Sequence, residues 1–276
     1  MPVHSIVSRG RAIYQRYNQL NGRTTAAAIT LYGFLALFAL AVVAVAIVGF
    51  LSSGNDHVAA DIVNWLGVTG TAAKVVTDAV DAASNSARVA SVIGFVGLIW
   101  VGSSFAVAIA HAYNEAWRVP TRVNFARLKG LGWLGGAALM LGAGSVVTAG
   151  LATLPALLAP LVLTVSLGVN TALWMWTSWV LPNRRVSWRA LLPAAIFGAV
   201  GLELLKLAGG YVVPLLVSRS SALYGTIGVV FALLAWLLVL GQLVVFVTVI
   251  EVDGWERAHG TEEVTVKVPL LPDRQG

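Results

Sequence analysis

The strongest constraint on this chain is a series of long apolar segments with almost no charge. Residues 26–51 contain no Asp, Glu, Lys or Arg. Five further runs of the same kind follow, at residues 89–111, 131–154, 156–181, 190–213 and 224–250. A run of about 20 apolar residues is long enough to cross a bilayer as a helix, and only helices or closed barrels satisfy the backbone there. The pattern predicts an all-α membrane protein, a bundle of about six transmembrane helices.

Composition supports this interpretation and narrows the chemistry. Of 276 residues, 58% are hydrophobic and only 11% are charged, whereas a soluble domain carries about a quarter charged residues. Cysteine is absent, which excludes disulfides, thiolate metal sites and cysteine nucleophiles. No P-loop, dinucleotide fingerprint or HExxH motif occurs, and the four histidines are scattered. We therefore expect no enzyme activity, no catalytic residue, no cofactor, no metal and no nucleic-acid partner.

Charge distribution predicts the topology. Residues 1–25 form a polar, basic arm with no visible signal peptide, and the connectors after the second and fourth runs are rich in Arg. The connectors after the first, third and fifth runs hold few basic residues. By the positive-inside rule, both termini and the tail 251–276 are predicted to be cytoplasmic, and residues 26–250 are predicted to form the membrane domain. Residues 52–88, which lie outside, are predicted to form a short amphipathic helical segment.

Small residues indicate how the helices pack. Gly102, Ala106 and Ala110 recur every four residues, and Gly132 and Gly136 form a GxxxG pair. Such faces permit close approach of helices. We favour packing within one chain, and a homo-oligomer formed through one of these faces is the alternative.

Two charged residues inside the fifth run are the most informative candidates. Glu203 and Lys206 lie three residues apart and share one helix face. A charge at the centre of a span costs roughly 2.5–3.5 kcal/mol on insertion scales, so the pair is expected to face the bundle interior or a wet cavity. It is either a substrate or ion pathway, or a mutually neutralised structural pair. Asn170 and Gln242 are further polar residues in apolar runs, where they line the same pathway or only bond neighbouring helices.

The basic connectors suggest a second kind of contact. Their cations could bind anionic headgroups of membrane lipids, or they could serve orientation alone. The candidates for headgroup contact are Arg118, Arg122, Arg127, Lys129, Arg184 and Arg185.

Several short patterns together resemble a known family. They are Ala26-Ala27-Ala28 with Tyr32, Leu35 and Phe38; Gly97–Trp100 with Ser103, Ser104, Asn114 and Trp117; Glu203, Lys206 and Tyr211; and Tyr224-Gly225-Thr226-Ile227-Gly228 with Trp236. Their order and spacing, over roughly residues 10–255, are similar to the YihY/BrkB family of bacterial inner-membrane proteins. One departure is Ala39, where the family often has Pro.

The resemblance implies six membrane helices and cytoplasmic termini, and it leaves the activity open. Family members have been labelled ribonuclease BN and virulence factor BrkB, and some are linked to envelope lipid transport. A nuclease needs a water-exposed site with clustered acids, and the short cytoplasmic segments here do not provide one. Our leading hypothesis is a transporter or envelope-lipid-handling protein with a polar intramembrane site. The alternative is a scaffolding protein that binds a partner through the outer segment 52–88.

Overall fold

The structure is a computed structural model of the whole chain. It describes residues 3–52, 94, 96–121, 123–152, 159–224, 226–260 and 265–267. They belong to two compact units, residues 1–32 with 104–276 and residues 33–103, and each unit is described by itself. Apart from Ser52, the predicted amphipathic segment 52–88 lies outside the described residues.

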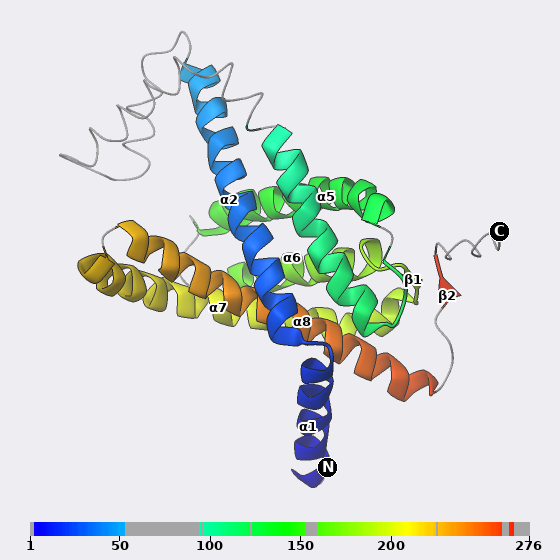
Figure 1. Cartoon of the computed structure of the whole chain (residues 1–276). Helices are drawn as coiled ribbons and strands as arrows, with labels where there is room; N and C mark the ends of the chain where they lie inside the picture. The colour runs from blue at the N-terminus through cyan, green and yellow to red at the C-terminus, as the bar shows by residue number, and fades with distance from the viewer. Residues whose placement is uncertain are drawn as a thin grey trace. The chain divides into compact units, whose positions relative to one another are not determined.

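The described elements are almost all helices (Figure 1). A helix over Val96–Ala116 carries no label in Figure 1. The labelled elements are α1 (Val3–Gln19), α2 (Gly22–Ser52), α5 (Val123–Ala152), α6 (Ala159–Val180), β1 (Arg184–Arg185), α7 (Trp188–Tyr224), α8 (Thr226–His259) and β2 (Thr265–Val266).

Six helices among the described residues are long and apolar enough to cross a membrane. Their candidate spans are Gly22–Leu40, Val96–Ala116, Phe125–Leu151, Pro160–Val180, Trp188–Val212 and Val230–His259. The predicted all-α bundle of about six membrane helices is therefore confirmed.

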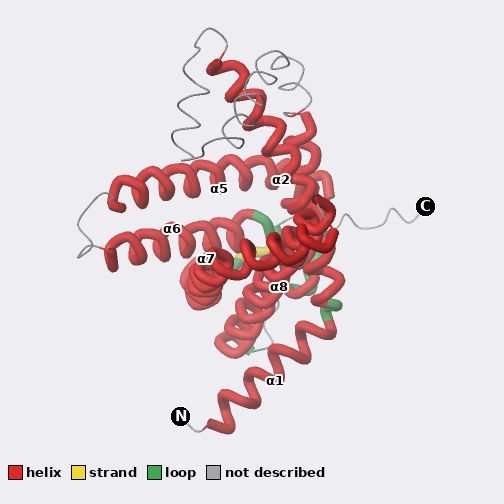
Figure 2. The backbone as a smooth tube through the Cα atoms, turned by 90° about the vertical axis from the view of Figure 1, so that its left-hand side faces the viewer, coloured by secondary structure: helices red, strands yellow, loops and turns green. Residues whose placement is uncertain are grey.

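Within the larger unit, α6 packs against α5 on one side and α7 on the other, and α7 runs along α8. Figure 2 shows α5 and α6 side by side. Glycines make room for tryptophans of α6: a Cβ at Gly136 of α5 would lie 2.7 Å from the ring of Trp176, and one at Gly198 of α7 would lie 2.7 Å from the ring of Trp174. Gly136 therefore serves packing within the chain, as small residues in membrane helices commonly do.

The helix ends differ from the sequence-based expectation in two places. The backbone of α7 stays helical past Pro214 to Tyr224, whereas the apolar run that predicted this span ends at residue 213. Membrane bundles tolerate proline inside helices better than soluble proteins do. At the C-terminus, α8 continues to His259. Glu251, Val252 and Trp255, which we assigned to the tail 251–276, are buried residues of this helix.

The tail also contains a short strand that the apolar pattern could not indicate. Strand β2 pairs antiparallel with β1, with Arg184 opposite Val266 and Arg185 opposite Thr265. The backbone N–H of Lys267 donates to the carbonyl of Asn183 at 3.4 Å, which extends the same register by one residue.

The contact between α2 and α8 yields a first prediction. A Cβ at Gly241 of α8 would lie 2.6 Å from the carbonyl oxygen of Ala26 and 3.0 Å from Oγ1 of Thr30. We expect Gly241→Ala to destabilise the protein by about 1–3 kcal/mol, since the helices must separate to admit the methyl group. Thermal unfolding of the purified protein in detergent measures this.

Gly254→Ala on the same helix is the control, because nothing lies within 4 Å of a Cβ at Gly254. Alanine there should be neutral or stabilising by up to about 1 kcal/mol, through its better helix propensity. Equal melting temperatures for the two variants would contradict the close approach of α2 and α8.

Candidate functional site

A polar cluster lies between α6 and α7, within two otherwise apolar spans. One carboxylate oxygen of Glu203, Oε1, accepts hydrogen bonds from Ser166 Oγ at 2.6 Å, from Asn170 Nδ2 at 2.6 Å and from Lys206 Nζ at 2.7 Å. Lys206 Nζ also donates to Ser166 Oγ at 2.9 Å. The helical repeat produces this set, because residues three or four apart on each helix lie on one face.

The two charges of this cluster differ in exposure. The side chain of Glu203 is 14% exposed, whereas that of Lys206 is 48% exposed. Large apolar residues on the same stretch of α7 are also exposed, with Leu204 at 60% and Leu207 at 65%. In a membrane bundle such apolar surface faces lipid. The ammonium group of Lys206 therefore lies at the border between the polar cluster and the lipid-facing surface of α7.

Three of the four predicted pathway residues meet in this cluster, namely Glu203, Lys206 and Asn170. Ser166 joins them, and sequence analysis missed it. Its position four residues before Asn170 on the same helix could have indicated it. Gln242 is half-buried on α8, and none of the hydrogen bonds of the cluster reaches it among the described residues.

A second polar cluster, at the end of α8, was not expected. Arg184 and Glu251 form an ion pair whose side chains are 2% and 0% exposed. Trp117 binds both partners: its Nε1 donates to Glu251 Oε1 at 3.2 Å, and the Arg184 guanidinium carbon lies 4.1 Å from its ring centre. Arg184 Nη2 also donates to the carbonyl of Ser178 at 3.2 Å. Burial lowers the pKa of Arg184, and the Glu251 carboxylate opposes that shift; the guanidinium stays charged at neutral pH.

Hydrogen bonds of two asparagines join the connectors around this ion pair. Asn114 accepts from the backbone N–H of Asn183 at 2.7 Å and donates to Thr121 Oγ1 at 3.1 Å. Asn183 in turn donates to the carbonyl of Pro120 at 3.1 Å. The connectors that follow residue 116 and α6 are therefore bonded directly to each other.

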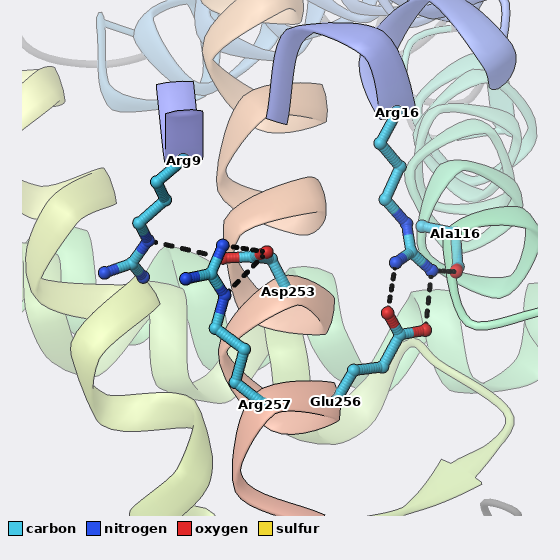
Figure 3. Close-up of polar contacts among 6 residues, drawn as sticks. All are labelled: Arg9, Arg16, Ala116, Asp253, Glu256 and Arg257. Carbon is cyan, nitrogen blue, oxygen red and sulfur yellow. Dashed lines mark hydrogen bonds and ion pairs between the residues drawn. The ribbon is translucent and has the colours of Figure 1, made fainter. Parts of the chain in front are cut away.

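The N-terminal helix is joined to the same end of α8 (Figure 3). Arg16 forms an ion pair with Glu256 and donates to the carbonyl of Ala116 at 3.2 Å. Nearer the start of α1, Nε of Arg9 lies 3.4 Å from Oδ2 of Asp253. The other carboxylate oxygen of Asp253 lies 2.9 Å from Nη2 of Arg257. These bonds fix one face of α1 against α8.

The predicted headgroup contacts have mixed outcomes. Arg184 is a correction: it is buried and paired with Glu251, so it is not available to a headgroup. Arg122 lies outside the described residues. Arg118 and Arg185 are exposed, whereas Arg127 and Lys129 are half-buried on the first turns of α5.

Comparison with known proteins identifies the family. The family model described as virulence factor BrkB matches residues 13–264. The chain belongs to the BrkB family. It is also 24% identical over 241 residues to an uncharacterized protein of Dickeya dadantii (strain 3937), with 77% of this chain and 73% of that protein covered. No solved structure matches the chain.

As a BrkB-family protein with six candidate spans, the chain is a multi-pass membrane protein. The structure also gives a physical role to two of the residues on which the resemblance rested. Asn114 holds the connector that carries Asn183, and Trp117 packs on the buried ion pair. Glu251 was missed because it directly follows an apolar run, where a carboxylate usually marks the end of a span.

The buried pair yields a second prediction. We expect Arg184→Met to destabilise this BrkB-family protein by about 3–5 kcal/mol, because it leaves the Glu251 carboxylate buried and unpaired. Arg185→Met, at the exposed neighbouring arginine, should change stability by no more than about 0.5 kcal/mol. Detergent-solubilised melting temperatures give both values.

The double variant Arg184→Met with Glu251→Gln tests the cause. Removing the second charge should recover part of the lost stability, since contacting residues are not additive. A double variant less stable than Arg184→Met alone would show that the loss is one of packing and not of an unpaired charge.

Proposed function

We propose that this BrkB-family protein is a non-enzymatic transporter or lipid-handling protein of the bacterial inner membrane, acting through the Glu203–Lys206 cluster. The observation that carries the proposal is the ammonium group of Lys206, half-exposed beside exposed leucines on a membrane-spanning helix. The structural alternative is a mutually neutralised pair in which Lys206 snorkels outward, and the assay below distinguishes the two.

The arrangement suits an anionic headgroup. An ammonium group has three N–H donors, and the described contacts of Lys206 use two of them, to Glu203 and Ser166. Glu203 holds the lysine side chain in place through the bond at 2.7 Å. A phosphate that approached along the lipid-facing side of α7 could accept a charge-assisted hydrogen bond from Lys206. The cost of the exposed charge in lipid would then be offset by the substrate.

Transfer would follow from exchange of partners on Lys206. With no substrate, the ammonium group is bonded to Glu203 and Ser166. When a headgroup arrives, the lysine can swing toward it, while Asn170 and Ser166 continue to donate to the carboxylate at 2.6 Å. The carboxylate is therefore not left without hydrogen bonds when the lysine moves.

A flip assay tests this proposal. The protein is reconstituted into vesicles with fluorescent phosphatidylglycerol, and the rate at which the lipid crosses the bilayer is followed by quenching from outside. We expect Glu203→Gln and Lys206→Met each to slow protein-dependent crossing by about tenfold or more, since each removes a charge-assisted hydrogen bond. Glu115→Gln, at a carboxylate on another helix paired with His111 at 3.7 Å, is the matched control and should keep the wild-type rate.

Two results would reject the proposal. One is a wild-type rate equal to that of protein-free vesicles. The other is wild-type crossing in both Glu203→Gln and Lys206→Met, at equal amounts of reconstituted protein.

The proposed topology has its own test. The sequence contains no cysteine, so single-cysteine variants need no altered background. We expect Arg118→Cys to react with a membrane-impermeant maleimide only after cell lysis, because the Arg-rich connectors face the cytoplasm. Asp56→Cys, in the outer segment, should react in intact cells. The reverse pattern would mean that the termini are outside.

A further inference from the structure

The β1–β2 pairing separates two consecutive arginines. Successive side chains of a strand point to opposite faces, so Arg184 and Arg185 cannot share one. Arg184 turns to the buried Glu251, and Val266 opposite it packs against the apolar core. Arg185 therefore lies on the outer face of the pair, together with Thr265 opposite it.

Lys267 is brought to the same outer face. It is two residues beyond Thr265, and it is thus the diagonal neighbour of Arg185 across the pair, a separation of about 7–8 Å between Cα atoms. Its ammonium group donates to the carbonyl of Trp179, at the end of α6, at 2.7 Å. The lysine is thereby held between the strand pair and the end of a helix.

The third cation of this group, Lys129, belongs to α5. The ammonium group of Lys129 lies 4.3 Å from the ring centre of Phe125, one helical turn earlier. It is buried without a hydrogen-bond partner among the described residues. An ammonium group removed from water with no acceptor is costly, and a bound anion would offset that cost.

No carboxylate in the described part of the chain forms an ion pair with these three cations, Lys129, Arg185 and Lys267. Burial, and after it the positive charges of Lys129, Arg184 and Arg185, lowers the pKa of Lys267 to about 8. The fold thus gathers like charges around one partly buried lysine, where bound negative charge would be stabilised.

We propose that Lys129, Arg185 and Lys267 form a binding site for a phosphate group, which the tail completes by supplying Lys267, the residue that directly follows β2. Lys129 and Arg185 lie close enough to Lys267 for their charges to act on it, and each of the three side chains can donate a charge-assisted hydrogen bond to an anion. The phosphate belongs either to an anionic lipid headgroup or to a free phosphate ion. The site shares no residue with the Glu203–Lys206 cluster, so an experiment that rejects one of the two proposals leaves the other unaffected.

Binding to the full-length protein in nanodiscs tests the site. Native mass spectrometry measures retention of phosphatidylglycerol in phosphatidylcholine discs, and a parallel titration with inorganic phosphate uses discs of phosphatidylcholine alone. We expect Lys129→Gln with Lys267→Gln to weaken binding by about tenfold or more. The glutamine at position 267 can still donate to the Trp179 carbonyl. Arg11→Gln with Arg257→Gln removes the same charge from exposed positions on α1 and α8 and should bind within about twofold of wild type.

The two arms identify the source of the phosphate. Loss of phosphatidylglycerol binding alone assigns the site to a lipid headgroup, and loss of inorganic phosphate binding in lipid-neutral discs assigns it to the free ion. Either supports the site. A Lys129→Gln, Lys267→Gln protein that binds both ligands as the control does would overturn it. Lys129→Arg with Lys267→Arg, which keeps the charges, should restore binding and thereby excludes misfolding as the cause.

The pH dependence provides an independent measure. Lys267 binds an anion in its protonated form, which predominates below its pKa of about 8. Phosphatidylglycerol affinity should therefore decline as the pH is raised above about 8, because the phosphodiester itself does not titrate there. Among the described residues, the charges that act on Lys267 are those of Lys129 from α5 and of Arg184 and Arg185 from β1. Lys267→Arg should remove most of the decline, and an unchanged decline in that variant would contradict the role of Lys267.

Discussion

The ion pair of Arg184 and Glu251 sets the positions of the segments at one end of the bundle. Its two side chains are almost entirely buried, so breaking it would leave a charge in a medium that stabilises charge poorly. It connects the loop after α6 to α8, and through Trp117 to the end of the helix over Val96–Ala116. Asn114 and Asn183 then bond the two connectors to each other.

The Arg184–Glu251 and Glu203–Lys206 ion pairs differ in exposure. Arg184 and Glu251 are closed off from solvent and lipid alike, whereas Lys206 is 48% exposed beside a largely buried Glu203. The buried pair contributes to specifying the packing, and neither of its charged groups can exchange its partner for a ligand. The open pair keeps a charge at the surface of an apolar helix, where an exposed cation is costly.

Sequence predicted the parts of this molecule that depend on local composition. Long apolar runs revealed the spans, and Glu203 and Lys206 stood out because two charges lay inside one run. The different environments of Arg184 and Arg185, one buried and the other exposed, could not be predicted. They depend on a strand register with residues near the C-terminus, and both arginines looked alike in a basic connector. Glu251 was assigned to the tail because the pattern of apolar residues ends just before it, although the helix and the burial continue.

The attachment of α1 to α8 illustrates how magnitudes rank its contacts. Asp253 contacts two arginines that are about half-exposed, and exposed ion pairs contribute at most about 1 kcal/mol each. Arg16 is better placed, since its side chain is 16% exposed and it bonds Glu256 through both terminal nitrogens. Tyr17, 3% exposed and stacked 4.5 Å from Phe246 of α8, buries an aromatic ring, which contributes about 1.5–3 kcal/mol. Apolar burial therefore anchors α1, and the ion pairs around it mainly fix its rotation about its own axis.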